Sequence, residues 1–233
     1  MPWAMVEATD GAYNPEVVVS ADRYNEYIET ADCDTVPVFA GRACYQSWGR
    51  PNPETRTEIG YLGNIIAQNH ESVLEHSSAT FYITGVSRNL THELVRHRHL
   101  SFSEMSQRYV NMEDKDIVIP PALRAEHGEA SYARLPFAPT RDYDATVKRL
   151  MQAGHSRKAA REAARYILPG GTETRIVVTG DMRAWRDFLK KRWHVAADAE
   201  IRELARSVLK QLKAIAPGCF QDFDPSTPLG GDN

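Results

Sequence analysis

The length, composition and charge of the chain are those of an ordinary folded protein: 233 residues, 42% hydrophobic, 25% charged, enough to bury roughly 70 to 75% of the unfolded surface. A net charge of −3 argues against a protein that coats nucleic acid, which needs a basic excess, so any anion site must be local. Three cysteines without CxxC spacing predict neither a disulfide framework nor a zinc site, and because no apolar run approaches ~18 residues we expect a cytoplasmic protein without a membrane helix.

The first third of the chain is predicted to contain a short strand and two helices. Three consecutive valines, residues 17–19, favour a β-strand, and a helix is expected over 36–45. Thr55 and Glu58 have the T-x-x-E spacing of a capping box, which predicts the start of a second helix. Apolar residues then recur at helical spacing, and this helix should end near Asn69.

The middle of the chain is predicted to form a strand followed directly by a helix. Residues 79–84 alternate apolar and polar side chains, which is the period of a strand with one buried face, and Gly85 should end it. Ser87 is placed to cap the next helix, in which Leu90 and His97 share a face.

The remainder of the chain is predicted to add two strands and four helices, as follows: strands over 117–119 and 175–179, helices over 143–151 and 160–168, and helices capped by Asp181 and Asp198. Strands thinly interleaved with many helices predict an α+β layered fold. Because the chain has no internal repeat and no long linker, we expect one domain over residues 1–233. Its termini, about 1–14 and 222–233, should be loosely held.

Histidine and arginine are concentrated in one stretch. Five of the eight histidines lie within thirty residues, with four arginines nearby: His70, His76, His92, His97, His99, Arg88, Arg96, Arg98 and Arg108. A basic helix end that balances the helix dipole would account for an isolated Arg-His-Arg. On a continuing helix, Arg96 and Arg98 would point about 200° apart, so they can face the same way only if the helix ends there.

The next nine residues, 101–109, pack hydroxyls, an amide, a carboxylate and a guanidinium together. Arginine binds phosphate through a bidentate fork, while serine and backbone N–H groups complete the oxygen shell. A carboxylate such as that of Glu104 can meet a sugar hydroxyl. By themselves these groups predict only a nucleotide-like anionic ligand.

The order of the motifs is more specific than any one of them. Arg96-His97-Arg98, followed after seven residues by Ser106, resembles the signature of the flavin-dependent thymidylate synthases. Residues 70–76 resemble that family's H-x-S/T-x-x-E-H segment, and 106–109 resemble its S-x-R-Y segment. Further segments resemble its A-R-x-x-L-P and T-R elements, at 164–169 and 174–175, and the likeness runs from about Gly41 to Pro217.

This resemblance implies an activity, cofactors and an assembly. The chain would methylate deoxyuridylate (dUMP) to thymidylate (dTMP), with 5,10-methylenetetrahydrofolate as carbon donor, FAD as hydride carrier and NADPH as reductant. It would form a homotetramer with shared active sites and a mixed or antiparallel sheet flanked by helices, with no nucleic acid or membrane as partner. No thiol nucleophile is needed, which agrees with the lack of an obviously activated cysteine.

The resemblance also implies roles for individual residues. The positions expected to bind dUMP are Glu93, Leu94, Val95, Arg96, Glu104, Met105, Ser106, Gln107, Arg108, Arg165 and Arg192. Those expected to contact FAD are Ser72, Glu75, Arg96, His97, Arg98, Glu104, Asp181, Met182, Arg183 and Asp187. Arg192 would be the catalytic electrophile that stabilises charge on the uracil, and His70 would act on the folate and flavin N5 side of the pocket.

Three positions depart from the family pattern. Asp181 stands where relatives usually carry asparagine, and Asp187 stands where they carry asparagine or histidine. Ala196 stands where many carry histidine. Because a carboxylate beside a pyrophosphate would be repelled, the two aspartates are expected either to contact ribose or adenine, or simply to cap and solvate their helix.

Two other classes of function are compatible with parts of the sequence. A metal-dependent hydrolase would use the side chains His70, Glu71, Glu75, His76, His97 and His99, but the helical H-x-x-x-H and H-E-x-x-H spacings are absent, so we expect no metal. An RNA-binding module would use the arginines and histidines with Phe102 and Tyr109 as stacking platforms. The acidic net charge and the lack of an RNP-like motif argue against it.

Overall fold

The computed structural model describes residues 33–49, 52–113, 115–127 and 139–231, so the strand predicted over 17–19 lies outside the described residues. Contacts divide the chain into two compact units. The first unit comprises the described parts of Met1–Phe81, Arg98–Ser101 and Val178–Asn233, and the second comprises those of Tyr82–His97 and Phe102–Val177. The single domain over 1–233 stays a prediction.

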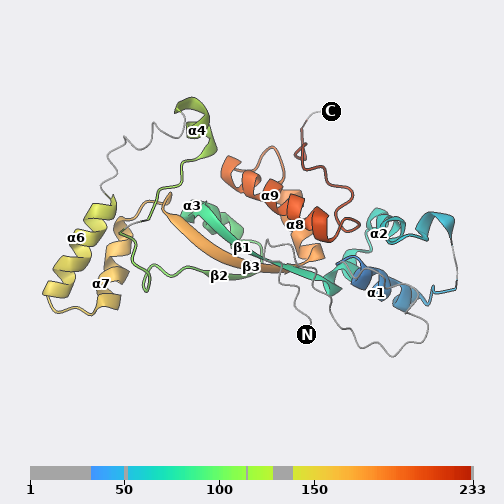
Figure 1. The fold of residues 1–233 in the computed structure, drawn as a ribbon, viewed down its shortest axis with the longest axis horizontal. Helices are drawn as coiled ribbons and strands as arrows, with labels where there is room; N and C mark the ends of the chain where they lie inside the picture. The colour runs from blue at the N-terminus through green and yellow to red at the C-terminus, as the bar shows by residue number, and fades with distance from the viewer. Residues whose placement is uncertain (1–32, 50–51, 114, 128–138, 232–233) are drawn as a thin grey trace. The chain divides into compact units, whose positions relative to one another are not determined.

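The described residues form an α+β fold around a three-stranded antiparallel sheet, which confirms the predicted fold class (Figure 1). The strand order is β1-β3-β2, with β1 at Ser78–Ser87, β3 at Glu173–Asp181 and β2 at Ser101–Glu104. In β1, Ala79 and Ile83 are buried while Tyr82 and Thr84 are exposed, as the alternating sequence predicts. The strand continues through Gly85, whose φ of 69° only glycine adopts readily, and ends at Ser87.

The helices of the first unit surround an aromatic and aliphatic core. They are α1 (Thr35–Tyr45), the 3-10 helices η1 (Pro53–Thr55) and η2 (Glu71–His76), α2 (Glu58–Ala67), α8 (Met182–Arg192) and α9 (Ala199–Ile215). Trp185 on α8 is fully buried and meets the rings of Phe81 and Phe188 edge-on. Its indole N–H donates to the Ala79 carbonyl at 3.1 Å, so helix and strand are joined by packing and by a satisfied polar group.

The second unit has a smaller core beneath two antiparallel helices. Its helices are α3 (Arg88–Leu94), α4 (Pro121–His127), α6 (Pro139–Gln152), α7 (Arg157–Ala164) and the 3-10 helix η3 (Arg165–Ile167). Tyr143 from α6 and Ala164 from α7 pack on Met112, and all three are fully buried. Small residues on α7 allow this close approach: Ala160 is also fully buried.

The predicted caps are confirmed at three helices and wrong at one. Ser87 accepts from the Leu90 N–H, Asp181 from the Ala184 N–H and Asp198 from the Glu200 N–H. The N-cap of α2 is Thr57, which accepts from the Gly60 N–H, and not Thr55. Pro53 explains the difference, because it starts the separate 3-10 turn of η1 that contains Thr55.

The strand predicted over 117–119 is reduced to an isolated bridge between Ile117 and Thr172. Two hydrogen bonds of 2.8 Å flank the bridge, from the Val118 N–H to the Gly171 carbonyl and from the Glu173 N–H to the Asp116 carbonyl. Pairing stops there because the partner segment turns back on itself, with the Thr172 N–H donating to the Pro169 carbonyl.

The chain after Phe220 is bound to the first unit over residues 222–231. The Trp193 indole donates to the Asp224 carbonyl at 2.7 Å, and the Leu229 N–H donates to the Trp193 carbonyl at 2.9 Å. These contacts hold a segment that the sequence analysis expects to be loose. Of the helices that the structure describes, none combines the length and apolar character needed to cross a membrane.

Candidate active site

The Arg-His-Arg segment directly follows a helix end, which is the condition for its two arginines to face the same way. Helix α3 stops at Leu94, and the next N–H groups close tight turns, from Arg96 to the Glu93 carbonyl and from His97 to the Leu94 carbonyl. Arg96 and Arg98 are exposed, whereas His97 is 7% exposed. The two guanidinium groups are therefore available to a ligand, while the imidazole between them is packed.

Glu104 is the centre of a hydrogen-bond network in the second unit. Its Oε1 atom accepts from Thr91 Oγ1 at 2.9 Å and from Thr174 Oγ1 at 3.2 Å, and lies 2.7 Å from Arg88 Nη1. The three donors come from α3 and β3 and converge on one oxygen of the carboxylate. The network fixes the end of β2, from which residues 105–109 continue.

Residues 106–109 form a turn that places serine and arginine side by side. The Ser106 carbonyl accepts from the N–H groups of Tyr109 and Val110, and the Ser106 hydroxyl oxygen accepts from the Arg108 N–H at 3.4 Å. Gln107 points inward and is buried, while Arg108 is exposed. The turn thus offers an exposed guanidinium close to a half-buried hydroxyl, which suits an anionic ligand.

Helix α7 adds two cations to this turn that were not predicted. Arg161 donates to the Tyr109 carbonyl at 2.5 Å, and the Lys158 ammonium lies 5.2 Å from the centre of the Tyr109 ring. Hydrogen bonding to Lys158 lowers the pKa of the Tyr109 hydroxyl. Positions 158, 161 and 165 follow the i, i+3, i+7 spacing of one helix face, and this spacing was the sequence signal that could have found them.

A second group of predicted residues gathers in the first unit around a cavity of about 280 Å³. The lining is Cys44, Tyr45, Asn69, His70, Ser72, Val73 and Arg183. Asn69 has a φ of 56°, a left-handed turn that asparagine tolerates, and it redirects the chain from α2 into η2. The Tyr45 hydroxyl lies 3.3 Å from His70 Nδ1, and the Arg183 guanidinium pairs with the Glu75 carboxylate.

Three predicted ligand residues have other contacts within the structure. Met182 is fully buried and its N–H donates to the Ser77 carbonyl, and the Leu94 side chain is fully buried as well. Asp187 pairs with Lys191 one turn along α8 at 2.7 Å. The side chains of Met182 and Leu94 are thus part of the core, whereas Asp187 makes an exposed ion pair on its helix, one of the roles expected for it. Arg192, half-buried, ends the same helix.

Asp181 caps α8, which is one of the roles expected for it, and its burial makes the ionised carboxylate unfavourable. Burial raises the pKa of its carboxyl, the Ala184 N–H acts against that change, and Glu75 adds repulsion. A carboxyl with a raised folded pKa binds its proton more tightly in the folded state. Ionised Asp181 therefore opposes folding, and this cost appears as the pH rises through the folded pKa.

We expect Asp181→Asn to be as stable as the parent at pH 7, or more stable by up to about 1 kcal/mol, because asparagine caps equally well without ionising. Asp181→Ala should lose about 1 kcal/mol with the cap. Urea unfolding at several pH values measures both, and the advantage of asparagine should shrink toward pH ~4. The exposed cap Asp198, changed to asparagine, is the matched control. A large loss in Asp181→Asn would contradict this account.

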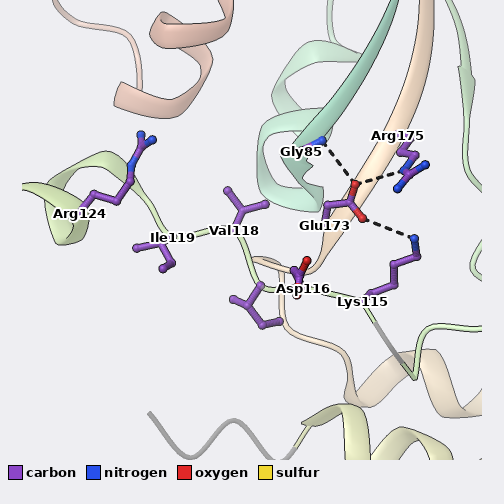
Figure 2. A pocket seen from close by; sticks show the side chains of 9 residues that line it. Gly85, Lys115, Asp116, Val118, Ile119, Arg124, Glu173 and Arg175 are labelled. Carbon is purple, nitrogen blue, oxygen red and sulfur yellow. Dashed lines mark hydrogen bonds and ion pairs between the residues drawn. The ribbon is translucent and has the colours of Figure 1, made fainter. Parts of the chain in front are cut away.

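A larger cavity of about 510 Å³ lies beside β3 in the second unit (Figure 2). Glu173 is at its centre: its carboxylate lies 3.3 Å from Arg175 and 3.6 Å from Lys115, and it accepts from the Gly85 N–H at 3.4 Å. Arg175 and Lys115 also line a cavity of about 480 Å³ next to Glu104. Arg175 stands in the T-R element, which was the available signal, but no role had been assigned to it.

Among the described residues, no three His, Cys, Asp or Glu side chains are grouped to hold a metal ion. The hydrolase interpretation therefore has no site in this part of the chain. The guanidinium, hydroxyl and imidazole groups described above are instead the kind that bind phosphates and heterocycles.

Comparison with known proteins agrees with this chemistry. The family model described as thymidylate synthase complementing protein matches residues 27–218. The chain is 48% identical over 217 residues to the flavin-dependent thymidylate synthase of Mycobacterium tuberculosis (strain ATCC 25618 / H37Rv), which covers 87% of this chain and 85% of the relative. The corresponding enzyme of Mycobacterium sp. (strain JLS) is 50% identical over 198 residues, covering 80% and 78%. The chain therefore belongs to the family of the flavin-dependent thymidylate synthases.

Proposed function

We propose that this protein makes dTMP from dUMP by flavin-dependent reductive methylation, in the cytoplasm. The observation that carries the proposal is the Arg-His-Arg segment at the end of α3, with both arginines exposed and with Ser106 in a turn that also exposes Arg108. This arrangement lies inside the range matched by the family. Neither a metal-dependent hydrolase nor an RNA-binding module fits that membership.

The residues of the first-unit cavity suit part of an FAD molecule. Ser72 supplies a hydroxyl, His70 an imidazole and Arg183 a guanidinium, a donor set fit for ribose and pyrophosphate oxygens. At about 280 Å³ the cavity is at the small end of ligand sites, so it holds only part of a dinucleotide. The other residues expected at FAD are assigned to the remaining contacts through side chain or backbone, and the buried Met182 and His97 among them through the backbone: Glu75, Arg96, His97, Arg98, Glu104, Asp181, Met182 and Asp187.

A cavity of that size also supports the proposal of a homotetramer with shared active sites. One copy of the chain would then complete the FAD site with residues of another. When bound, FAD supplies the hydride, NADPH reduces it, and 5,10-methylenetetrahydrofolate supplies the carbon. The chain itself binds, orients and stabilises charge.

The second unit is assigned to dUMP. Arg108 and Arg165 suit the phosphate, with the Ser106 hydroxyl completing its oxygen shell. Glu104 Oε1 already takes three contacts from the protein, so we assign Oε2 to a ligand hydroxyl. The other assigned contacts of this unit, through side chain or backbone, are Glu93, Leu94, Val95, Arg96, Met105 and Gln107. Arg192, a residue of the first unit, is assigned to dUMP as well, from the same or from another copy of the chain.

Two residues are assigned to the chemical step. Arg192 stabilises the negative charge that spreads over uracil N3 and O4 as C5 becomes nucleophilic. His70 is assigned to the side of the pocket that would hold the folate and the flavin N5, and its contact with the Tyr45 hydroxyl orients the imidazole.

An absorption spectrum of the purified protein tests the proposal. We expect a yellow protein whose flavin bands bleach with NADPH, and whose NADPH oxidation is stimulated by dUMP. Stoichiometric zinc without flavin would favour the hydrolase, and salt-sensitive retention of RNA by a colourless protein would favour the RNA-binding module.

Ser106→Ala should chiefly weaken dUMP binding, raising its Kd about tenfold, because one hydrogen bond from a neutral hydroxyl to a charged phosphate is lost. Calorimetric titration with dUMP measures this change. The control is Ser101→Ala, since Ser101 is exposed at the start of β2 and has no assigned role. Normal binding with complete loss of turnover would contradict the assignment.

A further inference from the structure

Arg186 is a charged residue buried in the first unit to which the proposed chemistry gives no role. Its side chain is 1% exposed, yet it carries a full guanidinium on the second turn of α8. Nη1 donates to the Cys219 carbonyl and to Asp222 Oδ1, both at 2.6 Å, and Nη2 donates to Asp222 Oδ2 at 2.7 Å. Nε donates to Glu71 Oε1 at 3.2 Å. One side chain thus joins α8, η2 and the C-terminal tail.

The charge on Arg186 is retained despite its burial. Desolvation lowers the pKa of the guanidinium, but the carboxylates of Asp222 and Glu71 outweigh it and the net pKa is raised. Phe223 covers one face of the group, with its ring centre 5.1 Å from the guanidinium carbon. A planar fork with five donors is needed for these contacts, and lysine could not reproduce them.

Three ion pairs join α8 to η2, one of them between Lys190 and Glu71 at 2.9 Å on the helix surface. Arg183 pairs with Glu75, and one turn further along α8 Arg186 pairs with Glu71. The order of the partners along η2 is reversed, so the two helices are held antiparallel. The side chains of the first pair are 51% and 47% exposed, whereas those of the second are 1% and 13% exposed. Buried pairs are screened less by water, so the second pair is the more rigid one.

We propose that Arg186 is a positioning residue for the flavin site: clamped by Asp222 of the tail, it fixes the register of η2 against α8. Ser72 and Glu75 follow Glu71 on η2, and Arg183 precedes Arg186 by one turn on α8. The contact between η2 and α8 therefore sets the spacing of Ser72 and Arg183, which line the cavity, and of Glu75, which pairs with Arg183. This inference rests on the proposed function, because it takes the cavity to hold part of FAD.

Asp222→Asn in the full chain is the sharpest test. The Asp222 side chain is 41% exposed, so water can reach the amide, and the variant should fold with Arg186 less firmly held. Its matched control is Asp224→Asn, two residues further on, since the Asp224 carboxylate bonds Ser226 within the tail. Titrating apoprotein with FAD and following flavin fluorescence gives Kd without any turnover. We expect Kd to rise about five- to tenfold in Asp222→Asn and to stay within twofold in the control.

A purely structural role would lower the melting temperature of Asp222→Asn but leave its Kd for FAD unchanged, and that result would overturn the inference. Glu71→Gln provides a second test, because it changes the partner of Arg186 on η2. It should raise Kd similarly, although Glu71 also pairs with Lys190. In the double variant Kd should rise by less than the product of the two single fold-changes, because both carboxylates hold Arg186. Fully additive effects would also overturn the inference.

The same titrations separate the inference from the proposed function. If the parent and Asp224→Asn bind no FAD, the proposed function fails and the inference fails with it. If they bind FAD and Asp222→Asn binds it equally well, only the inference fails.

Discussion

Arg192→Ala is expected to lower the rate of dTMP formation by about 100- to 1000-fold while the protein still folds and still binds FAD. The guanidinium is assigned to charge that develops on the uracil ring only during reaction, so its loss should reduce kcat more than substrate affinity. Folding should survive because Arg192 is half-buried in the last turn of α8, where water can reach its side chain and the helix dipole contributes about 0.3 to 1 kcal/mol.

Product formation, FAD titration and thermal unfolding together separate these effects. Lys210→Ala is the control, because it removes one exposed positive charge from α9 without touching an assigned residue. Arg192→Lys keeps the charge but not the planar fork, and should recover only a small part of the rate. Full activity in Arg192→Ala would remove Arg192 from the mechanism.

Glu104→Ala is expected to lower the free energy of unfolding by about 2 to 3 kcal/mol and to abolish dUMP binding in the measurable range. The change leaves the guanidinium of Arg88 and the hydroxyls of Thr91 and Thr174 without their shared acceptor. These groups are largely buried, so water replaces the lost contacts only in part. The end of β2 should loosen, and with it the turn that carries Ser106 and Arg108.

Urea unfolding and calorimetric titration with dUMP measure the two effects of Glu104→Ala. Glu104→Gln keeps a carbonyl acceptor and should lose about half as much stability, since only the charged contact to Arg88 is weakened. Glu162→Ala, on the exposed surface of α7, is the control and should cost less than about 0.5 kcal/mol. Unchanged stability of Glu104→Ala would show that the network is not a structural centre.

Local features of the fold could be predicted because they depend on neighbouring residues. The caps at Ser87, Asp181 and Asp198 need only a short polar side chain before a helix, and β1 needs only a period of two. Thr55 was misassigned because two threonines, at 55 and 57, compete for one helix start. Which one caps depended on the turn that Pro53 begins.

In the candidate site, too, some features depend on neighbouring residues and others on contacts between distant ones. The spacing of Arg96, Arg98 and Ser106 was enough to indicate the family, and the comparison confirms it. The contact of Tyr45 with His70 joins residues 25 apart in the chain, and the bonds from Arg88 and Thr174 to Glu104 come from separate elements. No local pattern marks such pairs, because they exist only after the chain has folded.

The sequence alone determined the fold class, three helix caps and the family to which the chain belongs. Only the tertiary structure decided that Arg186 is buried between Glu71 and Asp222, and that one oxygen of Glu104 collects three donors. The physical reason is that helix caps and strand periods are set by short stretches of chain, whereas a buried charge is stable only where distant segments bring its partners to it.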